Sequence, residues 1–223
     1  MNDNSALGVG LGMSALGAAA TYHNSKMNKN TLKFMTGNTR AAINNLDKNQ
    51  LLDDTFKKEQ KAALYKQAEN IVETKNLYKK NKIYLKQGVV LGTVLVACGA
   101  IVNAANNHQR ATSANNATTD KGNEYTKVNM GKKLGAILGA VAAVGIMAAN
   151  KAIMKPFNKI QKENLKNLEE FAGKDIAKLL KKSGHLAMAL TVAANAVGGL
   201  ALGAIADKIS NHKAAKAADK AVA

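Results

Sequence analysis

The chain has 223 residues, of which 47 % are hydrophobic, and a formal net charge of +17 from 32 basic and 15 acidic residues. This length suffices for one domain or two small ones. A single cysteine, Cys98, excludes an intramolecular disulfide bond. Only two of the cations are arginine, the residue that makes bidentate contacts to bases, so the composition does not favour sequence-specific recognition of nucleic acid.

The apolar residues gather in four blocks that contain no charged side chain: residues 6–22, 88–105, 134–149 and 186–206. As helices, blocks of this length measure roughly 24 to 32 Å, close to the ~30 Å of a bilayer's hydrocarbon core. A soluble bundle of buried, alanine-rich helices is the alternative, but a chain this short has little material to surround four of them. We therefore predict an all-α, polytopic helical membrane protein with four Gly/Ala-rich transmembrane helices and two lysine-rich amphipathic helical connections.

The first block follows a short N-terminal segment that carries Asp3 and no lysine or arginine. A secretory signal peptide begins with a basic region, so this block is better interpreted as an uncleaved anchor with an exported N-terminus. The small residues at 17–20 keep cleavage open as an alternative.

The first connection, residues 23–87, joins the first two blocks into a span pair over residues 1–105. It contains no glycine or proline between residues 55 and 87, and apolar side chains recur there every seven residues, at Leu64, Ile71, Tyr78 and Leu85. This spacing predicts an amphipathic helix that runs directly into the second span.

The second half of the chain repeats this order without a residue-by-residue match. An exposed polar loop is expected at residues 106–133, then a second span pair at 134–206 with its own lysine-rich connection at 150–185, and a basic tail at 207–223. In that connection, apolar residues follow Pro156 at helical spacing, and Gly184 is expected to separate the connection from the fourth span.

The distribution of lysine and arginine predicts the orientation. The two long connections, 23–87 and 150–185, carry 14 and 9 basic residues, against none in residues 1–5, five in 106–133 and four in the tail. Cytoplasmic loops are enriched in basic residues, so four spans with both termini outside fit this bias.

Glycines recur four residues apart in or beside every block and would line one helix face, where they permit close helix packing in lipid. The candidate helix-packing residues are Gly8, Gly12, Gly88, Gly92, Gly131, Gly135, Gly139, Gly199 and Gly203. Asn195, the amide nearest a span centre, is the candidate for an interhelix hydrogen bond. The blocks contain no acidic or basic residue of the kind that marks a transport path.

No motif for catalysis, a cofactor or a metal site is recognisable in the sequence. The functional hypothesis is an integral membrane protein with a non-enzymatic role in self-association or membrane scaffolding. Its expected partners are the lipid bilayer, anionic headgroups at the cytoplasmic face, and further copies of the chain in a homo-oligomer. A small pore or transporter, and a soluble basic helical protein that binds nucleic acid, are the alternatives.

Overall fold

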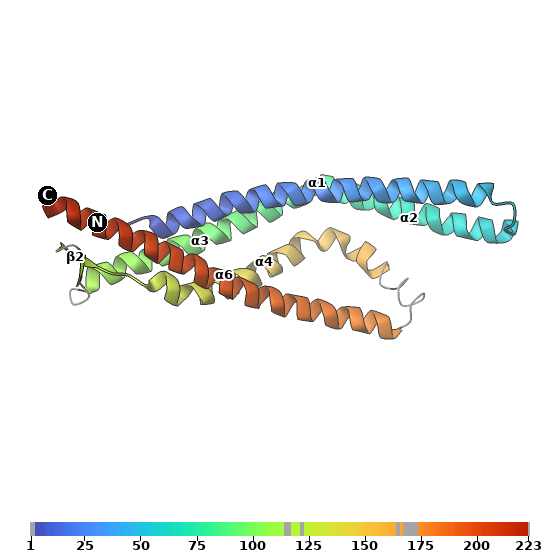
Figure 1. The fold of residues 1–223 in the computed structure, drawn as a ribbon. Coiled ribbons are helices and arrows are strands. Elements are labelled where there is room, and N and C mark those ends of the chain that lie inside the picture. The colour runs from blue at the N-terminus through green and yellow to red at the C-terminus, as the bar shows by residue number, and fades with distance from the viewer. Residues whose placement is uncertain (1–2, 114–116, 121–122, 164–165, 167–173, 223) are drawn as a thin grey trace. The chain divides into compact units, whose positions relative to one another are not determined.

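The computed structural model describes residues 3–113, 117–120, 123–163, 166 and 174–222. These residues form long α-helices and one short β-hairpin, as Figure 1 shows. The elements are α1 (Ser5–Lys48), α2 (Asp54–Lys80), α3 (Ile83–Thr112), β1 (Ala117–Asp120), β2 (Asn123–Thr126), α4 (Met130–Ile153), the short 3₁₀ helix η1 (Lys155–Phe157) and α6 (Lys174–Val222). The prediction of an all-α fold is confirmed.

The chain divides into two compact units, each assembled from separate segments of the sequence. The bundle unit comprises Met1–Ala18, Gly88–Lys151 and Lys178–Ala223, and it takes residues from all four uncharged blocks. The lysine-rich unit comprises Ala19–Gln87 and Ala152–Ala177. The helices α1, α3, α4 and α6 each begin in one unit and end in the other.

Among the residues that the structure describes, three helices are long and apolar enough to cross a membrane: α3, α4 and the Lys182–Val222 part of α6. This result agrees with a multi-pass membrane protein. The first uncharged block lies within α1, whose apolar residues are mostly glycine and alanine and are followed by Asn and Lys, so α1 does not reach the same hydropathy. The structure thus supports three of the four predicted spans by length and composition.

In the lysine-rich unit, the second part of α1 runs beside α2 (Figure 1), and Lys61 forms an ion pair with Asp47 across them. The chain turns between the helices, and the carboxylate of Asp53 caps α2 by accepting hydrogen bonds from the backbone N–H groups of Thr55 and Phe56. The predicted seven-residue repeat is the inner face of α2. Ile71 is buried there, with Leu64 and Tyr78 half-buried on the same stripe.

The prediction that this helix continues into the second span is wrong. The helix α2 ends at Lys80, and Lys82 adopts a positive φ of 48°, a left-handed conformation that no α-helix continues through. The chain therefore changes direction before α3 begins, which leaves Leu85 exposed instead of on the inner stripe. The turn brings the ring of Tyr84 against Tyr78, with 5.1 Å between centroids, and Phe157 packs on Tyr78 at 4.7 Å.

The structure differs from two further predictions in the second half of the chain. The connection predicted as a polar loop at 106–133 is partly helical up to Thr112 and then forms a hairpin, in which β1 pairs antiparallel with β2 from Ala117↔Thr126 to Asp120↔Asn123. Gly184 does not separate the lysine-rich segment from the fourth span, because α6 is continuous through it. A single glycine lowers helix stability by only about 1 kcal/mol, which is too little to end a helix of this length.

The left-handed residue between α2 and α3 predicts a stabilising substitution. Lys82→Gly should raise the thermal midpoint of helix unfolding, because glycine adopts this φ without a steric penalty, which amounts to roughly 1 kcal/mol for other residues. The matched control is Lys75→Gly, at an exposed position inside α2, which should lower the midpoint by a similar amount. Circular dichroism of the detergent-solubilised protein measures both, and equal effects of the two substitutions would contradict the assignment of the turn.

Candidate functional site: a glycine-packed bundle closed by polar contacts

The helices α4 and α6 approach so closely that backbone meets backbone. The facing positions run antiparallel: Gly131 meets Gly203, Gly135 meets Gly199, and Gly139 meets the backbone of Asn195. A β-carbon at any of these glycines would overlap a carbonyl oxygen of the facing helix, so only glycine fits. The predicted glycine stripes of the third and fourth blocks therefore lie against each other within one chain.

The first helix packs against α3 in the same antiparallel manner, but the glycines of α1 in this contact are not the predicted Gly8 and Gly12. A β-carbon at Gly10 would lie 2.8 Å from the carbonyl oxygen of Leu95, and one at Gly99 would lie 2.7 Å from that of Ala6. Gly8 and Gly12, by contrast, have nothing within 4 Å of such a position. The close contact with α3 is therefore made by Gly10, which lies two residues from each of the predicted glycines.

The contact continues toward the lysine-rich unit. A β-carbon at Gly92 would lie 2.7 Å from the hydroxyl oxygen of Ser14, and one at Gly17 would lie 2.8 Å from the side chain of Leu91. Gly88, the other glycine predicted in this block, is half-buried in α3. The facing residues on α1 are therefore spaced three to four apart, from Ala6 to Gly17, as one face of a helix requires.

The side chain of Asn195 forms a hydrogen bond within its own helix, whereas an interhelix hydrogen bond was predicted. Its amide Nδ2 donates to the carbonyl oxygen of Thr191, 2.8 Å away and one turn earlier in the same helix. Its backbone carbonyl lies against Gly139 of α4. The polar contacts between helices are made instead by residues at one end of the bundle unit.

Large apolar side chains of the bundle unit point outward. Val141 of α4 and Val197 of α6 are 63 % and 70 % exposed, while the small residues Gly131, Gly135 and Ala143 of α4 are buried. In the apolar 18-residue stretches of α3, α4 and α6, only 11 %, 6 % and 6 % of the residues, respectively, are buried. Soluble proteins place their large apolar residues inside, so this unit has the reverse arrangement.

At the end of the bundle unit that holds the chain termini, the buried carboxylate of Asp207 caps α4. It accepts hydrogen bonds from the backbone N–H groups of Gly131 and Lys132 at 2.9 and 2.7 Å, and from the amide of Asn106 at 2.9 Å. Asn106 in turn accepts from the N–H of Met130. The first turn of α4 contains no acidic residue of its own, and this carboxylate satisfies its free N–H groups from another helix.

A second group of polar residues closes the same end. The guanidinium of Arg110 on α3 donates to the carboxylate of Asp3 at 2.9 Å and to the hydroxyl and carbonyl oxygens of Ser210 on α6. The Ser210 hydroxyl also donates to Asp3, and the backbone N–H of Asp3 donates to Asn107. We call the residues Asp3, Asn106, Arg110, Asp207 and Ser210 the polar clasp. It connects the start of α1 with α3, α4 and α6.

The environment of Asp3 lowers its pKa. Burial by itself raises the pKa of this carboxyl, but hydrogen bonds from Ser210, Ser5 and Arg110 outweigh that effect and lower it from 3.8 to about 2. Asp3 is therefore a carboxylate at neutral pH, paired with the cation of Arg110.

The sequence patterns did not identify the polar clasp, because its members lie up to 207 residues apart. One signal was available: Asp207 directly follows the longest uncharged block, and Arg110 is one of only two arginines in the chain. No group of three or more His, Cys, Asp or Glu side chains that could hold a metal ion occurs among the described residues. Comparisons with protein-family models, curated proteins and solved structures found no match.

The glycine contacts between α4 and α6 predict opposite effects for one substitution made at two sites in α4. Gly135→Ala should lower the thermal midpoint of the detergent-solubilised protein, at a cost of about 1 to 3 kcal/mol, because the new methyl group overlaps the carbonyl oxygen of Gly199. Gly145→Ala is the matched control. It faces open space, so the better helix propensity of alanine should leave stability unchanged or higher. A loss of equal size at both sites would show that this packing is not what stabilises the bundle.

The low pKa of Asp3 predicts an acid-dependent loss of stability. Because the folded-state pKa lies below 3.8, the contribution of the carboxylate is complete above about pH 4 and is lost as the pH falls toward 2. The contribution at neutral pH is on the order of 2 kcal/mol. The difference in thermal midpoint between the wild type and Asp3→Asn should therefore shrink over this pH range. Asp54→Asn removes a fully exposed carboxylate and serves as the control; a difference that stays constant with pH would exclude this role for Asp3.

Proposed function

We propose that this chain is an integral membrane protein whose four antiparallel segments cross the bilayer, and that it acts as a non-enzymatic scaffold. In this proposal the bundle unit is the membrane anchor, and the two lysine-rich connections are cytoplasmic. The anionic headgroups of the cytoplasmic face are the first partner.

The reversed burial of the bundle unit is the observation that carries this proposal. Side chains such as Ile137, Val141 and Leu190 are more than 60 % exposed, while glycine, alanine and the polar clasp lie inside. In water, such a surface would be an aggregation hazard. In lipid it is the favourable arrangement, because the hydrocarbon solvates the large side chains and helices associate through small residues.

The crossing of the first block is supported by its pairing with α3. Contacts follow one another along both helices, from Asp3 with Asn107 at one end to Gly17 with Leu91 at the other. If α3 crosses the bilayer, this part of α1 lies at the same depths. Its modest hydropathy is tolerable because one face is covered by α3 and the other presents Leu11 and Leu16 outward.

The contacts that the glycines make favour scaffolding over self-association through the glycine stripes and over a pore. The stripes on α4 and α6 contact each other within one chain, so they are not free to join copies of it. A pore along the glycine faces would need open space where the two backbones touch. The lysine-rich helices, which continue from the anchor, are the surface through which a scaffold acts on headgroups or proteins.

The orientation rests on the basic residues together with the clasp. Asp3 and Ser210 meet at Arg110, so with four crossings both termini lie on one side, together with the β-hairpin. The 14 basic residues of 23–87 then lie on the opposite side, which is the cytoplasmic side by the positive-inside rule. Both termini are outside in this arrangement.

Extraction and tag accessibility test the proposal. The protein should stay with membranes after an alkaline carbonate wash and dissolve only in detergent, because the outward apolar side chains hold it in lipid. In intact cells, a peptide tag at the N-terminus and a cysteine at Glu124, in a Cys98→Ala background, should both react with impermeant reagents. A cysteine at Lys48 should be protected.

The tag result also distinguishes three spans from four. If the first block does not cross, the N-terminal tag will lie on the same side as Lys48 and opposite Glu124. Recovery of the folded protein in the carbonate-soluble fraction would refute the membrane assignment altogether.

A further inference from the structure

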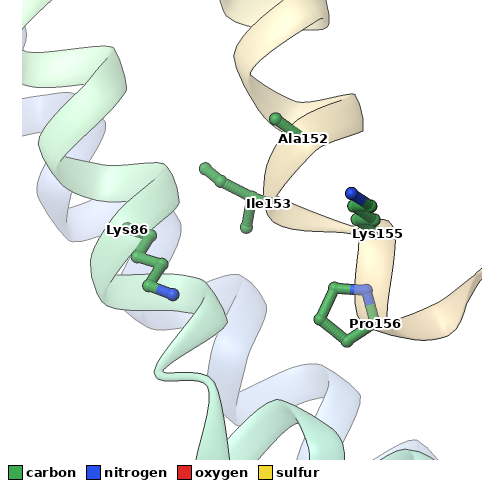
Figure 2. Close-up of a pocket in the computed structure, with 5 residues that line it drawn as sticks. All are labelled: Lys86, Ala152, Ile153, Lys155 and Pro156. Carbon is green, nitrogen blue, oxygen red and sulfur yellow. The ribbon is translucent and has the colours of Figure 1, made fainter.

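The lysine-rich unit contains an open depression of about 520 Å³ where the first turn of α3 faces the end of α4 and η1. It is lined by Lys86, Ala152, Ile153, Lys155 and Pro156. Figure 2 shows Lys86 on one wall and the other four residues opposite, with the side chain of Ile153 directed toward α3.

The sequence forms this depression through a break in the helix. The helix α4 ends at Ile153, and Pro156 occupies the first turn of η1, where its missing N–H group costs nothing. The N–H of Phe157 closes the turn on the carbonyl oxygen of Met154 at 2.9 Å, and the Phe157 ring is buried. The turn therefore holds Lys155 at the edge of the depression.

The charge at this site is not neutralised by the part of the chain that the structure describes. The ion pairs found among the described residues join Lys57 to Asp54, Lys61 to Asp47, Lys66 to Glu163 and Arg110 to Asp3, and neither Lys86 nor Lys155 takes part in them. Two exposed cations thus share one depression with three apolar side chains. Such a site fits a ligand that combines an anionic group with hydrocarbon.

The position along the chain fits the same kind of ligand. Lys86 lies two residues before the uncharged block 88–105, and Ala152 lies three residues after the block 134–149. In the bundle unit α3 and α4 run antiparallel, since Asn106 contacts Met130 near one end and Cys98 contacts Leu138 farther along. The start of α3 and the end of α4 therefore flank the same end of the two candidate spans, within one helical turn of the apolar region, where headgroups are found.

We infer that this depression binds the phosphate headgroup of an anionic phospholipid, with Lys86 and Lys155 contacting the phosphate and Ile153 and Pro156 contacting the adjoining glycerol and first methylene groups. Basic pockets beside transmembrane helices on the cytoplasmic side bind such headgroups. The lysine stems lie along apolar surface while the ammonium groups reach the phosphate. The inference rests on the proposed function, because it requires these helix ends to lie at the bilayer surface.

The test uses the full-length protein in nanodiscs that contain fluorescent phosphatidylglycerol or phosphatidylcholine with identical acyl chains, with energy transfer from a dye on the protein as the readout. The wild type should enrich phosphatidylglycerol over phosphatidylcholine. Lys86→Ala/Lys155→Ala should weaken phosphatidylglycerol binding by about 30-fold, since each lysine near an anionic surface contributes about 1 kcal/mol. The arginine pair, Lys86→Arg/Lys155→Arg, should retain binding.

The matched control is Lys48→Ala/Lys58→Ala, which removes two exposed lysines near the turn between α1 and α2 and should change binding by less than about threefold. An equal loss in this control would show diffuse attraction and overturn the site. Displacement of the lipid by millimolar inorganic phosphate would also overturn it, because the ligand would then be the free anion.

The single variants Lys86→Ala and Lys155→Ala, each expected to lose about fivefold, keep the test decisive if the double variant does not insert. A wild-type protein that inserts into nanodiscs without preferring phosphatidylglycerol refutes the site alone. A wild-type protein that does not insert refutes the proposed function and the site with it.

Discussion

The bundle unit depends on backbone contact between helices that only glycine permits. Between α4 and α6, three successive turns meet without any intervening side chain, and between α1 and α3 the same contact occurs at Gly10 and Gly99. Dispersion contacts of this kind are individually weak and fall off steeply with distance, so their sum depends on approach at van der Waals separation. In lipid, where apolar side chains gain nothing by leaving the solvent, this contact provides the main attraction between the helices.

The same geometry explains why the polar clasp lies at one end. Close packing leaves no room for large polar side chains between α4 and α6, so hydrogen bonding is concentrated where the helices end and their N–H groups are free. Asp207 supplies the missing cap of α4, while Arg110 joins the start of α1 to α6. Each buried polar group would be costly alone, but Asp3, Asp207 and Ser210 find hydrogen-bond partners in other segments, and these bonds join four segments at this end.

The lysine-rich unit is organised by different forces. Its helices pack through Ile71, Ile83 and the aromatic contacts of Tyr78, with ion pairs at Lys61 and Lys66. Most of its lysines with described side chains are exposed. One chain therefore combines a bundle of uncharged helices with a strongly basic unit. The depression at Lys86 and Lys155 lies where the sequence changes from lysine-rich to uncharged segments.

The sequence by itself determined which segments are helical and apolar, because segregation of charge and seven-residue spacing are local properties of the chain. It also indicated that helices pack through Gly131, Gly135, Gly139, Gly199 and Gly203, because their four-residue spacing places them on one face of each helix. Only the tertiary structure decided which faces meet. Gly10 and not Gly8 or Gly12 contacts α3, because the rotation of α1 about its axis depends on its partner. The turn at Lys82 and the clasp of Asp3, Arg110 and Asp207 were likewise undetermined by sequence, since the first requires a rare backbone angle and the second joins residues that only the folded bundle brings together.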